Sequence, residues 1–254
     1  MRHGSARDLP PHWYRYLLAA LIAWCVLAGR PVHATDDGVS ERAALYEESS
    51  TDPTGQRLVG SAVWRVDPAK SDTQAGDVTV RAIAEFPGKF RLCISLGRNS
   101  DPTLPANYLF RLTFVPSPGF SGRAIIHLPG MLMKSGEQAR GTPLQALAAK
   151  VVDNIFLVAL SNVDAQRNAN TLLLKERSWF DIPVIYADQR RAIIAIEKGM
   201  SGQKAIDAAI AAWEASPGGP VAQQPSSHGD DEASTCVARV AMSTQRSEER
   251  RVGK

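Results

Sequence analysis

Cations and an aromatic side chain gather in the second half of the sequence in a pattern suited to binding an anion. Lys175 and Arg177 lie beside Trp179 at an expected helix-to-strand junction, and Arg190 and Arg191 lie at the tip of the next hairpin. Guanidinium groups bind carboxylates and phosphates in bidentate fashion and stack on aromatic rings. These five residues are our candidate binding patch for an anionic ligand or a partner protein. The alternative is that Trp179 fills the core while the cations only face water.

Catalysis would need a nucleophile with a base, or a metal site. Apart from the terminal segments discussed below, the sequence contains one histidine, His127, in an apolar run typical of a strand. One histidine can complete a Ser–His–Asp triad, but the sequence has no Gly-x-Ser-x-Gly motif. Zinc-ligand spacings and phosphate-binding glycine loops are missing from it as well. We therefore expect a non-enzymatic protein with no cofactor and no metal; a hydrolase with an unrecognised site is an alternative.

Hydrophobic periodicity predicts a mainly β protein that would position these side chains. Alternation with a period of two is clearest over 78–86, and Pro87-Gly88 predicts a tight turn after it. Strands are expected at 58–66, 78–86, 90–96, 107–115, 123–128, 151–160 with a break at 153–154, 180–186 and 191–196. Short strands between Gly- and Pro-rich turns favour an antiparallel β-sandwich or barrel.

Helices are expected at 164–177 and 201–215, with a short helical turn near 143–148. In the 201–215 helix, the apolar side chains recur at helical spacing and form one stripe. They are Ile206, Ala209, Ile210 and Trp213. The fold expected is therefore a β-sandwich or barrel with a C-terminal amphipathic helix.

The sequence divides into five segments. Residues 1–34 combine a basic start, a short apolar run and small residues before Thr35, which predicts a cleavable signal peptide; an uncleaved membrane anchor is the alternative. Residues 35–57 are expected to be an extended lead-in, and 58–215 the β-rich domain. Residues 216–245 are expected to be a disordered or unreliable tail. The last nine, 246–254, read RSEERRVGK and resemble a translated sequencing adapter.

The formal net charge of +3 comes from the ends of the chain. Residues 1–34 hold four arginines and one aspartate, and 246–254 hold four cations and two glutamates. The remaining body is slightly acidic, whereas nucleic-acid binding needs clustered basic residues. We expect no nucleic-acid partner, and contact with a membrane only through an uncleaved N-terminal segment.

Three motifs carry a resemblance to known proteins over roughly residues 43–214. They are Leu45-Tyr46-Glu47-Glu48, Val59-Gly60-Ser61-Ala62-Val63-Trp64-Arg65 and Leu173-Leu174-Lys175-Glu176-Arg177-Ser178-Trp179-Phe180-Asp181-Ile182-Pro183. With them the chain resembles a family of uncharacterised exported or membrane-anchored proteins from rhizobia and related alphaproteobacteria. More distantly, it is similar to invasion-associated locus B proteins, which also end in a Lys-Gly segment and a short Ala-rich helix.

These observations lead to an expected function in the cell envelope. We expect a periplasmic or secreted, non-enzymatic β-domain protein that binds another envelope protein or an anionic ligand. The distant resemblance implies an alternative, a secreted or surface factor in host or cell-surface interactions.

Overall fold

The computed structural model describes residues 39–49, 52–67 and 78–215. Their strands form one antiparallel sheet in the order β8-β7-β11-β12-β1-β2-β3-β4-β5-β10-β9, and β6 pairs with β11 beside this path. The strands are β1 (Glu41–Glu47), β2 (Gln56–Asp67), β3 (Thr79–Phe86), β4 (Phe90–Arg98), β5 (Ala106–Pro116), β6 (Ile125–His127), β7 (Leu132–Lys134), β8 (Thr142–Pro143), β9 (Ala146–Val152), β10 (Ile155–Ser161), β11 (Trp179–Tyr186) and β12 (Arg191–Glu197).

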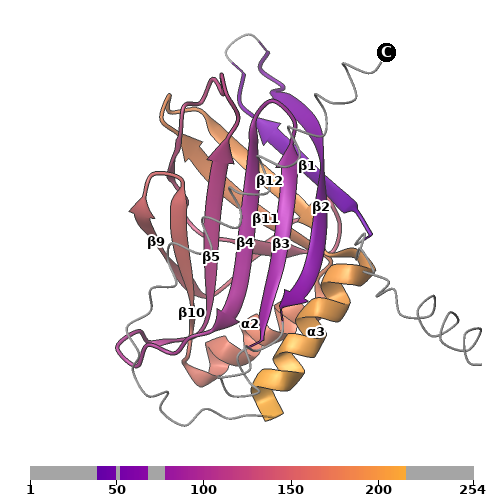
Figure 1. Cartoon of the computed structure of the whole chain (residues 1–254), viewed down its shortest axis with the longest axis vertical. Helices are drawn as coiled ribbons and strands as arrows, with labels where there is room; N and C mark the ends of the chain where they lie inside the picture. Colours follow the sequence, from indigo (N-terminus) through magenta and orange to yellow (C-terminus); the bar gives the residue numbers. More distant parts are fainter. Residues whose placement is uncertain (1–38, 50–51, 68–77, 216–254) are drawn as a thin grey trace, which may run out of the picture. The chain divides into compact units, whose positions relative to one another are not determined.

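The sheet curls so that its inner face encloses the core (Figure 1). Along β3 and β4 every second side chain is buried, as the two-residue period of a strand requires. Phe110 of β5 meets Phe180 of β11 edge to face, with ring centroids 5.9 Å apart. Because β12, β1, β2, β3 and β4 separate these two strands in the sheet, the contact requires strong curvature.

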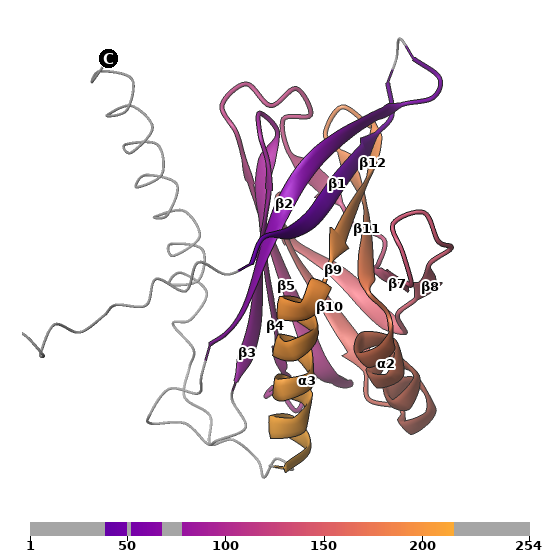
Figure 2. The ribbon, with the colours of Figure 1, turned by 90° about the vertical axis from the view of Figure 1, so that its right-hand side faces the viewer.

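Two helices, α2 (Asp164–Glu176) and α3 (Gly199–Ala215), complete the domain. Figure 2 shows α3 alongside β1, β2 and β3, and α3 contacts all three strands. The expected apolar stripe of α3 is buried, and Trp213 Nε1 donates a hydrogen bond to the carbonyl oxygen of Val78 (3.1 Å). On α2, the side-chain amide of Asn170 donates to the carbonyl oxygen of Gln145 and accepts from its N–H. Neither described helix is long and apolar enough to cross a bilayer.

The expected fold class is confirmed: the protein is mainly β, with a curled antiparallel sheet and a C-terminal amphipathic helix. The expected helices at 164–177 and 201–215 correspond to α2 and α3. The break expected at 153–154 is the β9–β10 turn, where Asn154 has a φ of 69°. Left-handed backbone is tolerated by asparagine better than by most residues.

Two expectations about local structure are wrong. Residues 35–57 are not a lead-in throughout, because Glu41–Glu47 forms β1 inside the sheet, between β12 and β2. The β-rich domain therefore begins before residue 58. The helical turn expected near 143–148 is instead β8 and the start of β9. The signal peptide expected at 1–34 and the tail segments 216–245 and 246–254 lie outside the described residues.

Candidate functional site

A small hydrophobic cluster lies on the outward face of the sheet. Ala44 of β1 and Ala195 of β12 are paired in register and fully buried, although they point away from the main core. The indole of Trp179, at the start of β11, packs with them, and Tyr46 packs against the same cluster. Small side chains thus leave room for a large aromatic ring on this face.

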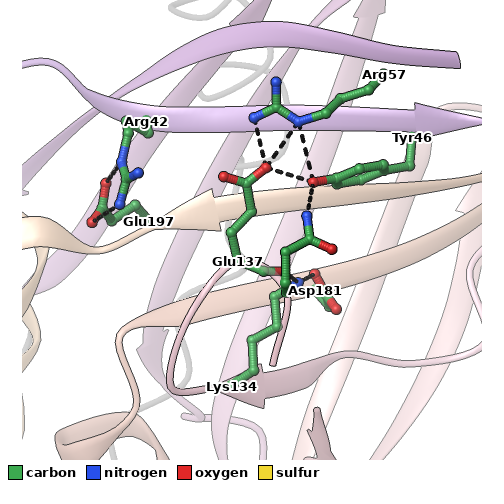
Figure 3. Close-up of polar contacts among 8 residues, drawn as sticks. Arg42, Tyr46, Arg57, Lys134, Glu137, Asp181 and Glu197 are labelled. Atoms are coloured by element: carbon green, nitrogen blue, oxygen red, sulfur yellow. Dashed lines mark hydrogen bonds and ion pairs between the residues drawn. The ribbon is translucent and has the colours of Figure 1, made fainter. Parts of the chain in front are cut away.

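Arg42 lies over the Trp179 ring of this cluster and pairs with Glu197, and Figure 3 shows that ion pair. Its guanidinium carbon is 5.1 Å from the centroid of the Trp179 ring. Its Nε and one terminal nitrogen donate hydrogen bonds to the two carboxylate oxygens of Glu197, at 2.7 and 3.0 Å. These hydrogen bonds lower the pKa of Glu197, so its carboxylate remains charged. The Arg42 side chain nevertheless stays 69% exposed.

A second polar group lies further along β1. The Tyr46 hydroxyl donates to Glu137 Oε1 (2.5 Å) and accepts a hydrogen bond from Gln138 Nε2 (2.7 Å). Arg57 of β2 donates to the same Glu137 oxygen at 2.6 Å. The hydrogen bond from Tyr46 lowers the pKa of Glu137, while burial raises the pKa of Tyr46. The group therefore holds the loop between β7 and β8 against the outward face of β1 and β2.

Lys134 anchors the loop between β7 and β8 to β11. Its side chain, on β7, is only 4% exposed, and its Nζ lies 2.6 Å from Asp181 Oδ1 of β11. The same ammonium donates to the carbonyl oxygen of Glu137 (2.5 Å). Burial raises the pKa of Asp181, and the hydrogen bond from Lys134 opposes that shift. This partly buried ion pair thus positions Glu137, the residue that meets Arg57 and Tyr46.

The groups on this outward face form what we call the polar surface: Arg42, Tyr46, Arg57, Glu137, Gln138 and Glu197. An open groove of about 820 Å³ adjoins it, since Glu197 belongs to both. The other residues that line the groove are Ser178, Gly199, Met200, Gln203, Lys204, Asp207 and Ala208. Met200 is 84% exposed at this groove.

The polar surface is electrically balanced, and the candidate catalytic histidine lies elsewhere. Two guanidinium groups face two carboxylates on the polar surface, so its charges balance. No cluster of three or more metal-ligating side chains occurs within the described residues. His127 is exposed on β6, as expected for a histidine on a strand face, and it does not line the groove.

Three of the sequence-predicted site residues lie at the junction of α2 and β11, but none of them lines the groove. Trp179 is buried beneath Arg42, in the small outward cluster and not in the main core. Lys175 lies in the last turn of α2, with its Nζ 3.6 Å from a carboxylate oxygen of Glu214 on α3. Arg177 is half-buried, and its Nε has no hydrogen-bond partner in the described part of the chain.

The predicted patch is not assembled, because Arg190 and Arg191 lie at the other end of β11. The seven residue steps from Trp179 to Tyr186 span about 23 Å along an extended strand. Arg190 packs over the Tyr186 ring at 5.6 Å and donates hydrogen bonds to Asp188 and Ser121. Arg191 starts β12 and donates its backbone N–H to Glu48 Oε2 (2.9 Å). Arg190 and Arg191 are therefore too far from Trp179 to bind one small ligand together with it.

Sequence reasoning missed the residues of the polar surface. Arg42 and Glu197 are 155 positions apart and meet because β1 pairs with β12. Tyr46 was identified only within the Leu45-Tyr46-Glu47-Glu48 motif, and nothing in the sequence connects it to Glu137.

Comparison with known proteins identified no similar protein. No protein-family model matches the chain, and no curated protein and no solved structure matches it either. The resemblances to rhizobial exported proteins and to invasion-associated locus B proteins therefore stay predictions.

Proposed function

We propose that the protein is an exported, non-enzymatic protein that binds another component of the cell envelope through its polar surface and the adjoining groove. The observation that carries this proposal is Arg42, which is highly exposed while Glu197 and Trp179 fix its guanidinium. A group held in one orientation before binding loses little conformational entropy when a partner arrives. Arginine beside tryptophan is also typical of the residues that dominate protein interfaces.

The charge balance favours a protein as the partner. Arg42 and Arg57 are each matched by a carboxylate, Glu197 and Glu137. A polyanion would have to displace both carboxylates or lie beside them, which costs electrostatic energy. A protein surface that presents both signs of charge can bind without breaking either pair. The groove beside Glu197 would accept a side chain or loop of that partner.

Export is supported by the sequence pattern of residues 1–34. The expected mature chain begins at Thr35, and intact-mass measurement of protein recovered from the periplasm tests this. A chain found intact in the cytosol would contradict the proposal.

In-cell photo-crosslinking tests the binding site. A photoreactive residue at Met200, in the groove, should capture a specific envelope protein. The matched control is Leu104, which is exposed in the loop between β4 and β5; that loop follows Arg98, which donates a hydrogen bond to the carbonyl oxygen of Trp213 at the opposite end of α3 from Met200. A partner captured equally at both positions, or at neither, would contradict the proposed site. A captured host or cell-surface protein would favour the invasion-associated alternative, and turnover in a broad substrate screen would favour a hydrolase.

A further inference from the structure

Strand β9 ends the sheet, and one of its sides has no hydrogen-bonded partner among the described strands, although β6 lies near its C-terminal end. Within the described residues it pairs only with β10. Six of its seven residues are exposed. Leu147, Val151 and Val152 have exposed fractions of 73%, 51% and 55%. The strand thus offers both unpaired backbone groups and apolar side chains, at the edge seen beside β10 in Figure 1.

Proteins usually protect such edges with charges, prolines or bulges. The only charged residue of β9 is Lys150, whose Nζ is 2.9 Å from Asp153 Oδ1 in the following turn. One neutralised lysine is weak protection for a strand of this length. The unprotected edge therefore points to strand addition, in which another extended segment continues the sheet.

The apolar character of β9 continues onto its neighbours. Ala149 is opposite Leu157 of β10, and Leu147 is opposite Ala159, which in turn is opposite Leu109 of β5. These side chains lie on the outward face, since the alternate residues of β10 are buried in the core. Larger exposed apolar patches on a domain mark contacts with other molecules.

We propose that this edge binds a second copy of the chain, with two β9 strands antiparallel about a twofold axis at Ala149. The numbers of two residues that face each other across the axis then sum to twice 149. Leu147 meets Val151 of the second copy, and Lys150 meets Ala148 of the second copy. The largest apolar side chains pair with each other, and each lysine lies beside a small side chain while keeping its own Asp153.

Other registers of the same pair are less favourable. An axis at Lys150 would place two ammonium groups directly opposite, which is destabilising. An axis at Ala148 would pair Leu147 with Ala149 and leave Val151 beyond the centre of the ladder. The sequence of β9 therefore selects the register centred on Ala149.

The expected dimer is concentration-dependent. A ladder of seven residues is about 23 Å long, which is short beside the interfaces of permanent dimers. None of its residues belongs to the polar surface or lines the groove. Dimerisation would therefore leave the polar surface available, so the inference stands or falls independently of the proposed function.

Cysteine crosslinking of the full chain tests the register. Ala149→Cys should form a disulfide-linked dimer on mild oxidation, because the two Cβ atoms would lie about 5 Å apart. Leu147→Cys alone should not, since its copies lie four residues apart along the ladder. Mixing Leu147→Cys with Val151→Cys chains should restore crosslinking. The unchanged chain controls for the native cysteines.

Sedimentation velocity tests the dimer without any crosslink. The dimer fraction should rise with concentration and fall at least several-fold in Val151→Lys, whose circular dichroism should match that of the native chain because Val151 is exposed. A chain that stays monomeric up to about 1 mM, or equal crosslinking of Ala149→Cys and Leu147→Cys, would overturn the proposal. So would a monomer that binds an extended apolar peptide at β9 in place of its own copy.

Discussion

The ammonium of Lys198 donates a hydrogen bond to the carbonyl oxygen of Leu174 at 2.6 Å, and both side chains are fully buried. Leu174 lies in the last turn of α2, whose carbonyl groups have no partner inside the helix. Lys198 immediately precedes α3 and also donates to Gln203 Oε1 (2.7 Å). One buried cation thus joins the end of α2 to the start of α3, where the negative end of the α2 dipole favours it.

Replacing Lys198 with methionine should destabilise the fold. The Lys198→Met side chain has similar length but leaves the Leu174 carbonyl and the Gln203 amide oxygen without their donor. Each buried group that loses its partner costs about 1 to 3 kcal/mol. We expect the free energy of unfolding in urea to fall by about 2 kcal/mol or more. Lys204→Met, on the groove side of α3, is the control and should change it little.

The stability contributed by Lys198 should depend on pH. Burial lowers its pKa from 10.5 to about 8, so the native protein binds fewer protons than the unfolded chain between these values. Stability should therefore rise with pH from about 8 to 10.5, by at most about 1.4 kcal/mol per pH unit. The difference in unfolding free energy between native and Lys198→Met proteins should widen over this range. A difference that narrows would mean that the buried amine prefers to be charged.

Replacing Glu47, the last residue of β1, should lower the free energy of unfolding. It is 3% exposed, accepts a hydrogen bond from the Tyr186 hydroxyl (2.8 Å) and pairs with Lys89 Nζ (2.5 Å). Glu47→Ala leaves a cation without its partner and should cost about 3 kcal/mol or more. Glu47→Gln retains an acceptor and should cost less. The exposed Lys150–Asp153 pair is the control, because Asp153→Ala should cost under about 1 kcal/mol in the same urea titration.

Strands with one buried face could be predicted from the sequence. Strand β1, which is buried on both faces, could not. Alternation in β3 and β4 is regular because their outward faces are only partly covered. In β1, Ala43, Ala44 and Leu45 are all buried, because Trp179 and Tyr46 cover the outward face as well. A strand buried on both faces loses its period of two. Its short apolar run then resembles an irregular segment.

The residues of the polar surface are brought together by the pairing register of the strands, which a single sequence does not reveal. Trp179 was identified from its type and its cationic neighbours, but its true cation, Arg42, comes from a strand that was not predicted. Arg190 and Arg191 were grouped with Trp179 because they follow it closely in sequence. The length of β11 separates Arg190 and Arg191 from Trp179. Trp179 starts β11 and pairs with Glu197 at the end of β12, whereas the two arginines lie at the hairpin turn.

Arg42 should matter for binding more than for stability. Its ion pair with Glu197 is exposed, so Arg42→Ala should lower the unfolding free energy by under about 1 kcal/mol. Capture of the envelope partner through Met200 should nevertheless fall about tenfold, as expected when about 1.4 kcal/mol of binding energy is lost. Arg167→Ala removes a comparable surface pair with Asp164 on α2 and should leave capture unchanged. Equal capture by both variants would remove Arg42 from the binding site.

Gly199 should tolerate no side chain where α3 begins. Its φ is +56°, and an added Cβ would lie 1.9 Å from the carboxyl carbon of Glu41. Glu41 would have to move, which would break the hydrogen bond that it accepts from Ser201 Oγ (2.8 Å). With the left-handed backbone strain, Gly199→Ala should cost about 2 kcal/mol or more. Gly136→Ala is the control, because its added Cβ meets no atom within 4 Å.

A double variant separates the two causes. In a Glu41→Ala background the overlap disappears, so Gly199→Ala should then cost only the backbone strain of about 1 kcal/mol. Thermal or urea unfolding of the four proteins in this cycle measures the coupling directly. If the cost of Gly199→Ala stays the same in both backgrounds, the contact with Glu41 does not limit this position.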